Sequence, residues 1–143
     1  MKKIFIFLAL GLMFLAPEAK SQTLANLANV DYPTLVIDTV TNTGTGALFI
    51  ALSQPYSNVT IQPKVTKISG TMTSNSNVKL YGSIDGTNYY AITGDTMQIT
   101  NTSSPIVTAW VKTSQGYKYY KVQWTGAGTM SAKLEAKIFL VKQ

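Results

Sequence analysis

The chain contains no cysteine, no histidine and no arginine among its 143 residues. Without histidine it lacks the usual general base near neutral pH and the commonest metal ligand. Without cysteine it lacks a thiolate nucleophile, a disulfide and a zinc knuckle. Charged residues are also scarce, at 13%, whereas the hydrophobic content of 45% suffices for a folded core. We therefore expect one globular domain, at about 100–200 residues per domain, with no enzymatic activity and no cofactor.

Residues 1–21 have the three parts of a secretory signal peptide. A lysine pair near the start precedes an apolar run at residues 4–15, and the small residues Ala19 and Ser21 occupy positions −3 and −1 of a cleavage site. At 1.5 Å per residue, this run is too short to span a hydrocarbon core of about 30 Å. No cysteine follows it, which excludes a lipid anchor. We expect export of a single domain, residues 22–143, that does not contact the membrane after cleavage.

Basic residues are in modest excess once the signal peptide is removed, because nine lysines and five acids remain and give a net charge of +4. The lysines are scattered along the chain, at positions 64, 67, 79, 112, 118, 121, 133, 137 and 142. A nucleic-acid-binding protein more often carries arginine and a basic stripe. We interpret these lysines as solubilising residues on outward strand faces and edges, and we expect no nucleic-acid partner.

Short β-branched and apolar segments follow one another through the mature sequence, separated by turn-forming residues about every ten positions. Pro63 lies inside one of them, where it removes a backbone donor and favours an edge strand or a bulge. The pattern predicts an all-β fold, an antiparallel β-sandwich of the jelly-roll or Ig-like kind with about eight to nine strands. The nine candidate strands are residues 35–40, 47–52, 59–68, 78–84, 89–93, 97–100, 106–113, 117–125 and 130–141.

Alternation of side chains assigns a face to each residue of the last two candidate strands, because one face of a sheet in a sandwich is buried. In residues 117–125 the predicted buried face holds Tyr120, Val122 and Trp124. In residues 130–141 it holds Met130, Ala132, Leu134, Ala136, Ile138 and Leu140. Polar and charged residues occupy most positions of the opposite faces. With no disulfide available, this core has to carry the stability of the domain.

An aromatic surface patch is the main candidate for a binding site. In the seventh candidate strand, alternation places Val107, Ala109 and Val111 in the core and turns Trp110 and Lys112 outward. The tentative binding residues are therefore Trp110, Tyr119, Lys121 and Tyr81. Aromatic residues with polar tips are enriched where a surface binds another surface or a sugar. The alternative interpretation is cross-strand packing of aromatic pairs on an ordinary exposed sheet.

The few carboxylates form no recognisable site. Asp85 and Gly86 make the strongest hairpin signal of the chain, because aspartate accepts backbone hydrogen bonds in turns and glycine tolerates positive φ. Asp85, Asn88 and Asp95 carry oxygens suited to Ca²⁺, but their spacing matches no defined calcium loop. Paired glycosidase carboxylates, a nucleophile elbow and a phosphate-binding glycine loop are also missing. We predict a turn role for Asp85 and no metal site.

Two short patterns occur twice in the same order. Residues 40–43 (VTNT) recur as residues 99–102 (ITNT), and residues 69–73 (SGTMT) are echoed by residues 126–131 (GAGTMS). The repetition fits either two related halves of the domain or chance in a chain rich in threonine and glycine.

Three segments between about residues 36 and 141 resemble small β-sandwich proteins encoded by tailed phages, especially those of Bacteroidota and marine bacteria. Residues 78–90 (VKLYGSIDGTNYY) resemble their L-x-G-S-x-D-G-x-N-W/Y hairpin, which also occurs in discoidin-like carbohydrate-binding modules. Residues 117–129 (YKYYKVQWTGAGT) are similar to their closing Y-x-Y-x-R/K-V-x-x-T-G-x-G-T segment, and residues 65–71 fit too. The resemblance implies a virion-associated structural or adsorption protein. The signal peptide departs from that pattern, because virion proteins assembled in the cytoplasm normally need none. It leaves room for a host-encoded or exported relative with the same fold, so viral and cellular origins both stay open.

The sequence therefore supports two classes of function. The first is a non-catalytic structural or interaction protein, exported or virion-associated, that forms a homo-oligomer or docks on a larger surface assembly. The second is a carbohydrate-binding adhesion module at the cell surface that uses the aromatic patch. A secreted hydrolase is the weakest interpretation, because no base accompanies the many serines and threonines. The sequence favours the first class, and the signal peptide predicts a secreted or cell-surface location.

Overall fold

The computed structural model describes residues 23–27, 34–54, 56–113 and 116–142. These residues form ten strands and no helix. The strands are β1 (Thr23–Leu27), β2 (Thr34–Thr41), β3 (Thr45–Leu52), β4 (Tyr56–Met72), β5 (Asn77–Ser83), β6 (Tyr90–Gln98), β7 (Ile106–Val107), β8 (Trp110–Thr113), β9 (Tyr119–Thr125) and β10 (Gly128–Lys142).

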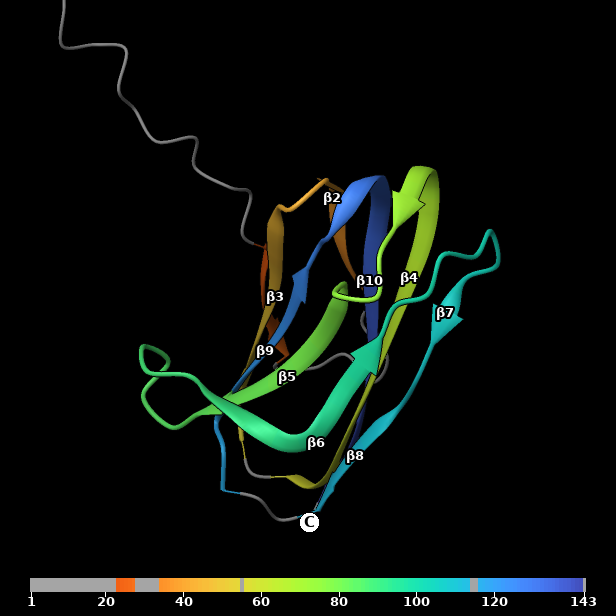
Figure 1. Ribbon diagram of the computed structural model, residues 1–143. Helices are drawn as coiled ribbons and strands as arrows, with labels where there is room; N and C mark the ends of the chain where they lie inside the picture. The colour runs from red at the N-terminus through yellow and green to blue at the C-terminus, as the bar shows by residue number, and fades with distance from the viewer. Residues whose placement is uncertain (1–22, 28–33, 55, 114–115, 143) are drawn as a thin grey trace, which may run out of the picture.

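Two sheets face one another in a β-sandwich (Figure 1). One has the order β1-β3-β9-β5-β6, and the other has the order β2-β10-β4-β7, with β8 also paired to β4. The β1–β3 pair is parallel and the other pairs are antiparallel. The predicted antiparallel β-sandwich is therefore confirmed. The strand count differs from the nine candidates, because β1 is added, two candidates join in β6, and residues 106–113 divide into β7 and β8.

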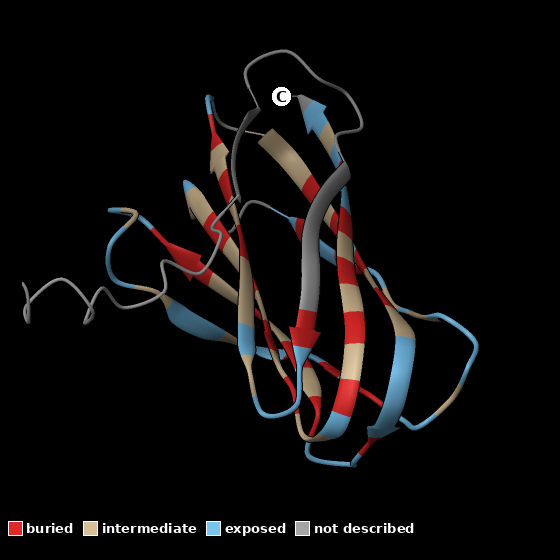
Figure 2. Cartoon of the chain, turned by 90° about the horizontal axis from the view of Figure 1, so that it is seen from above, coloured by how far each residue is buried: buried red, intermediate tan, exposed pale blue. Residues whose placement is uncertain are grey.

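The hydrophobic core lies between the sheets, and Figure 2 shows buried residues alternating with less buried ones along the strands. The predicted inward face of β9 is confirmed, because Tyr120, Val122 and Trp124 are at most 2% exposed. The inward face of β10 is confirmed from Met130 to Ile138, and Leu140 packs against the core while partly buried. Period-two alternation thus fixes the face of each residue in these two strands.

Pro63 lies in β4, a strand that is paired on both sides, so the prediction of an edge strand is wrong. Its carbonyl accepts a hydrogen bond from the backbone N–H of Thr108, at 3.3 Å, in the break between β7 and β8. The nitrogen and carbonyl of one strand residue point to the same side, so the missing donor of Pro63 also faces this break. The interruption between β7 and β8 therefore accommodates the proline.

The orientation predicted for residues 106–113 is also wrong. Trp110 is 6% exposed and Lys112 is buried, whereas Val111 is 58% exposed and Val107 also faces outward. Lys112 enters the interior because its ammonium forms an ion pair with the carboxylate of Asp95 on β6. Since β6 and β8 lie at the edges of different sheets, this ion pair joins the two edges.

The two echoed patterns at residues 69–73 and 126–131 do not occupy equivalent places. The first ends β4, whereas the second leads into β10, and the two pair antiparallel with each other. Gly70 has a φ of 73°, and a β-carbon on it would lie 1.8 Å from the carbonyl oxygen of Thr129. Glycine is needed there for the close approach of two backbones. The glycine of the first echoed pattern is therefore explained by the contact between β4 and β10, without a repeat of two halves.

Residues 1–21, the predicted signal peptide, lie outside the described residues, so their removal stays a prediction. Within the described ranges no helix is long and apolar enough to span a membrane.

Candidate functional site

Three side chains from neighbouring strands form a row on the outer face of the sheet that contains β9. Lys121 on β9 lies opposite Phe49 on β3 and opposite Tyr81 on β5. Each is half-buried and lies between two buried chain neighbours, so all three point away from the core. Side chains directly opposed in antiparallel strands have β-carbons about 4.5–5.5 Å apart, which brings the three together.

The ammonium group of Lys121 lies against two tyrosine rings. Its Nζ atom is 4.3 Å from the ring centroid of Tyr81 and 5.1 Å from that of Tyr89, both within the range of about 6 Å for cation–π attraction. Tyr89 lies just before β6, and its ring meets that of Phe49 edge-on, with centroids 5.6 Å apart. We refer to Phe49, Tyr81, Tyr89, Tyr119 and Lys121 as the Lys121 cluster.

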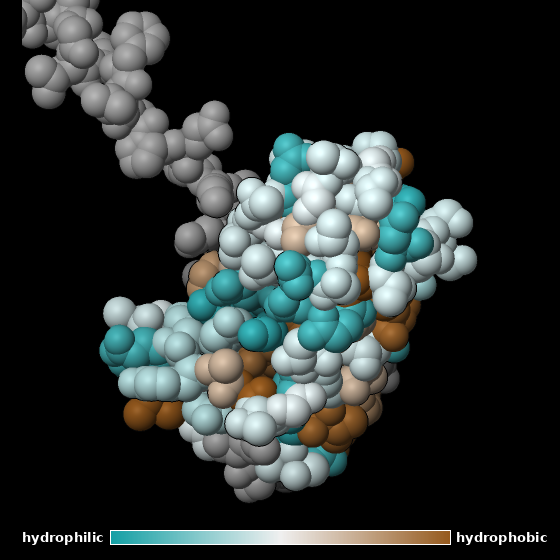
Figure 3. Space-filling view, in the orientation of Figure 1, coloured by the Kyte–Doolittle hydropathy of each residue, from teal (hydrophilic) through white to brown (hydrophobic). Residues whose placement is uncertain are grey.

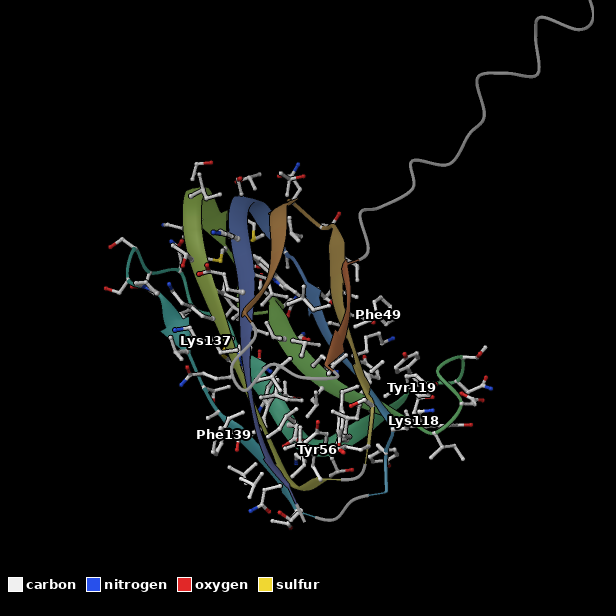
Figure 4. The ribbon with its side chains drawn as sticks, turned by 180° about the vertical axis from the view of Figure 1, so that it is seen from behind. Phe49, Tyr56, Lys118, Tyr119, Lys137 and Phe139 are labelled. Atoms are coloured by element: carbon white, nitrogen blue, oxygen red, sulfur yellow. The ribbon has the colours of Figure 1, made fainter. Side chains whose placement is uncertain are left out.

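Tyr119 extends this cluster toward the loop that joins β5 and β6. It lies opposite Ser83, the last residue of β5, and a β-carbon on Gly86 would lie 3.3–3.4 Å from its ring. The ring thus packs directly on the backbone of Gly86, whose φ of 76° also favours glycine. The ammonium of Lys118 lies 5.4 Å from the ring centroid of Tyr119. Figure 4 shows Phe49, Lys118 and Tyr119 on one side of the molecule, beside this loop.

Asp85 organises the loop formed by residues 84–89. Its Oδ1 atom accepts hydrogen bonds at 2.8 Å from the hydroxyl of Ser83 and from the backbone N–H groups of Thr87 and Asn88. Its Oδ2 atom accepts one at 2.7 Å from the side-chain amide of Asn88. The predicted turn role of Asp85 is confirmed, although the connection is wider than a two-residue hairpin. The loop projects from the sandwich (Figure 3), and because it ends at Tyr89, Asp85 helps to place that ring.

These hydrogen bonds hold the pKa of Asp85 well below its usual range, the backbone N–H of Asn88 contributing most. A lowered folded-state pKa stabilises the protein fully above the unfolded pKa of about 3.9, and this stabilisation is lost as pH falls below that value. We expect Asp85→Asn to lower the Tm by a constant amount above about pH 5, and the difference from wild type to shrink toward pH 2. Thermal unfolding of the wild type and of Asp85→Asn across this pH range measures the difference in Tm. A pH-independent difference would show that the charge does not hold the loop.

Burial changes the protonation equilibria within the Lys121 cluster. It lowers the pKa of the Lys121 ammonium, because a partly buried cation loses hydration. It also raises the pKa of the Tyr89 hydroxyl, to which nearby Tyr119 and Asp85 add smaller effects in the same direction. The tyrosine stays a neutral hydroxyl that can donate and accept hydrogen bonds, next to a cation with an incomplete water shell.

Three of the four residues predicted for the patch, Tyr81, Tyr119 and Lys121, lie together on this face. Trp110 does not, because it belongs to the other sheet and faces the core. Sequence reasoning misses Phe49 and Tyr89. The position of Phe49 depends on the pairing of β3 with β9, which no local pattern reveals, and only the proximity of Tyr89 to the Asp85 turn could have pointed to it.

The carboxylates considered for calcium do not come together. Asp85 uses its oxygens within its own loop, whereas Asp95 is paired with Lys112 between the sheet edges. In the part of the chain that the structure describes, no group of three acidic side chains is placed to hold a metal ion.

Comparison with known proteins places the chain by its fold alone. No family model matches, and no curated protein matches in sequence. A mitogen derived from Yersinia pseudotuberculosis has a TM-score of 0.50 and 7% identity, covering 78% of this chain and 87% of its own. The enzymatically active domain of bacteriophage CBA120 tailspike protein 4 also has a TM-score of 0.50, with 8% identity, covering 78% of this chain and 19% of its own. A family 16 carbohydrate-binding module has a TM-score of 0.46 and 14% identity, covering 73% of this chain and 74% of its own.

Proposed function

We propose that the protein binds carbohydrate through the Lys121 cluster. The observation that carries the proposal is the cluster itself: on an outer sheet face, the rings of Tyr81 and Tyr89 lie against the Lys121 ammonium, and the ring of Phe49 meets that of Tyr89. Binding sites for small molecules and sugars combine such apolar rings with a few placed polar groups.

The geometry suits a sugar for two reasons. Aromatic rings present flat apolar surfaces to the C–H faces of a pyranose, while tyrosine hydroxyls and the lysine ammonium supply hydrogen bonds to its hydroxyl groups. Phe49, Tyr81, Tyr119 and Lys121 also stand on paired strands, and the hydrogen-bonded Asp85 loop holds Tyr89. Groups held on strands keep their geometry better than groups on free loops, so little order has to be gained on binding.

We expect Tyr81→Ala to weaken glycan binding at least about tenfold, which corresponds to about 1.4 kcal/mol. The substitution removes one stacking surface and the ring beneath the Lys121 ammonium, at 4.3 Å. A glycan array followed by calorimetry with the best soluble oligosaccharide measures the effect.

Tyr90→Ala is the matched control for this experiment. It removes the same side chain from β6, where Tyr90 is 69% exposed and makes no ring contact with the cluster among the described residues. Equal affinities for wild type and Tyr90→Ala, with a loss only in Tyr81→Ala, support the site. An array without signal, or equal losses in both variants, would reject it and leave cross-strand packing as the explanation of the cluster.

Self-assembly is the second candidate function. On the outer face of the other sheet, Val111 and Phe139 both lie opposite Thr60, and both are exposed. Exposed apolar residues in one row favour contact with a second copy of the chain. Light scattering across a concentration series tests self-assembly, because a protein that stays monomeric at every concentration rules this candidate function out.

The proposal includes export, with residues 1–21 as the leader and residues 22–143 as the single mature domain. A glycan-binding protein of this kind acts outside the cell or on its surface. Mass spectrometry of the protein recovered from its producing cells tests cleavage before Gln22.

A further inference from the structure

The outer face of the sheet continues beyond the Lys121 cluster as a polar surface. The next row along the strands consists of Lys79 on β5, which lies opposite Gln123 on β9 and Thr96 on β6. The row after that places Asn77 opposite Thr125. One face therefore presents aromatic rings at one end and amide, hydroxyl and ammonium groups at the other, on four hydrogen-bonded strands.

Two lysines of this face are close neighbours in the sheet. Lys121 and Lys79 are diagonal neighbours on paired strands, because Lys79 lies two residues from Tyr81, the partner of Lys121. Diagonal neighbours in a sheet are roughly 7–8 Å apart, within reach of long side chains. A chain of sugar rings lying along the strands would thus meet Lys121 beside the aromatic rings and Lys79 beyond them.

The lysines of this face have no carboxylate partner among the described residues. The ion pairs of the described residues lie elsewhere: Lys64 and Lys133 pair with Glu135 on the other sheet, and Lys112 pairs with buried Asp95. Asp85, in the loop beside the Lys121 cluster, accepts hydrogen bonds of its own loop with both carboxylate oxygens. Lys79, Lys118 and Lys121 therefore outnumber the one carboxylate of Asp85 beside them and give this face a net positive charge. Charge of one sign on a binding face attracts a ligand of the opposite sign.

We propose that the ligand of this face is an acidic glycan, whose carboxylate or sulfate groups pair with Lys121 and Lys79 while its rings stack on Tyr81 and Tyr89. This inference rests on the proposed carbohydrate-binding function and specifies its ligand class. Lys121 suits this role because the tyrosine rings hold its ammonium in place, and because burial lowers its pKa, a sign that its charge is poorly hydrated. An anionic group supplies the interaction that water does not.

A single-stranded nucleic acid also combines flat rings with negative charges, but the observations favour a glycan. Proteins that bind nucleic acid in this way track the backbone with a clustered basic groove, usually with arginine. This chain has no arginine, and the side chains opposite Lys79 are the amide of Gln123 and the hydroxyl of Thr96. Amides and hydroxyls match the hydroxyl groups of a sugar.

The test uses calorimetry of the protein with four probes: an alginate oligosaccharide for carboxylate, dextran sulfate for sulfate, neutral dextran, and an oligothymidylate. We expect one or both acidic glycans to bind at least about tenfold more tightly than neutral dextran and the oligothymidylate. The alginate and dextran sulfate arms identify which acid group is preferred.

Variants locate the interaction on this face. Lys79→Gln and Lys121→Gln should each weaken acidic-glycan binding about tenfold, with Tm measured to confirm folding. The matched control is Lys137→Gln, which removes the same charge from an exposed position on β10 of the other sheet (Figure 4) and should change the affinity less than about twofold. Equal losses in all three variants would show only nonspecific attraction and would overturn the inference.

The remaining outcomes distinguish a failure of the acidic-glycan inference from a failure of the proposed carbohydrate-binding function. Neutral dextran bound as tightly as the acidic glycans, with Tyr81→Ala still weakening binding, overturns the acidic ligand class and keeps the carbohydrate site. No binding of any glycan overturns both. Tighter binding of the oligothymidylate than of every glycan also overturns both, and assigns the face to nucleic acid.

Discussion

Replacing Lys112 with alanine is expected to lower the free energy of unfolding by about 3–5 kcal/mol, the usual cost of breaking a buried ion pair. The Lys112 and Asp95 side chains are each only 10% exposed, and their ion pair joins β8 of one sheet to β6 of the other. The ammonium of Lys112 pairs with Asp95 Oδ2, and no other described residue donates a hydrogen bond to that atom, so in the variant the charge of Asp95 would lie in the interior without a counter-ion. Urea denaturation followed by tryptophan fluorescence measures the change.

Two control variants show whether the loss of stability in Lys112→Ala comes from the broken buried ion pair and not simply from the removal of a lysine. Lys64→Ala breaks a pair with Glu135 in which the lysine is 44% exposed, and should cost no more than about 1 kcal/mol. The double variant Asp95→Leu/Lys112→Met removes both charges and should recover most of the stability, because buried ion pairs are often replaceable by apolar residues. Similar costs for Lys112→Ala and Lys64→Ala would mean that water screens the Asp95–Lys112 pair.

The same ion pair explains why sequence reasoning assigned the wrong face to β8. A lysine is almost never buried unless it is paired, so the sequence pattern assigns Lys112 to the outer face and Val107, Ala109 and Val111 to the core. Asp95, its partner, lies on another strand, and no local pattern reveals their contact. Where strands carry no such long-range pair, as along β9 and most of β10, alternation predicts burial correctly.

The candidate site could be predicted only in part, for a similar reason. Alternation alone turns Tyr81, Tyr119 and Lys121 outward, because their chain neighbours Leu80, Tyr120 and Val122 occupy the core face. Their meeting depends on the strand order β3-β9-β5, which arises from pairings far apart in sequence. Phe49 illustrates the limit: it stands in an apolar run typical of a strand covered on both faces, yet it is half-buried on the outer face, where its ring meets that of Tyr89 edge-on.

Replacing Trp124 with alanine is the second substitution for which we expect a large effect, a loss of about 3–5 kcal/mol. Trp124 is fully buried on β9, the central strand of its sheet, and belongs to the core between the sheets. Removing the indole leaves a cavity that strands held by hydrogen bonds on both sides cannot close. Urea denaturation measures the loss, with Trp110 as the remaining fluorophore.

Trp124→Phe is the informative comparison, because the indole Nε1 atom is buried and has no hydrogen-bond partner among the described residues. Phenylalanine keeps most of the apolar volume and removes an unpaired donor, so we expect this variant to lose less than about 1.5 kcal/mol. A loss as large as that of alanine would show that the N–H group is satisfied, as by a buried water molecule. The small expected loss would mean that Trp124 stabilises the fold by its volume, which is how a sandwich without disulfides has to be held together.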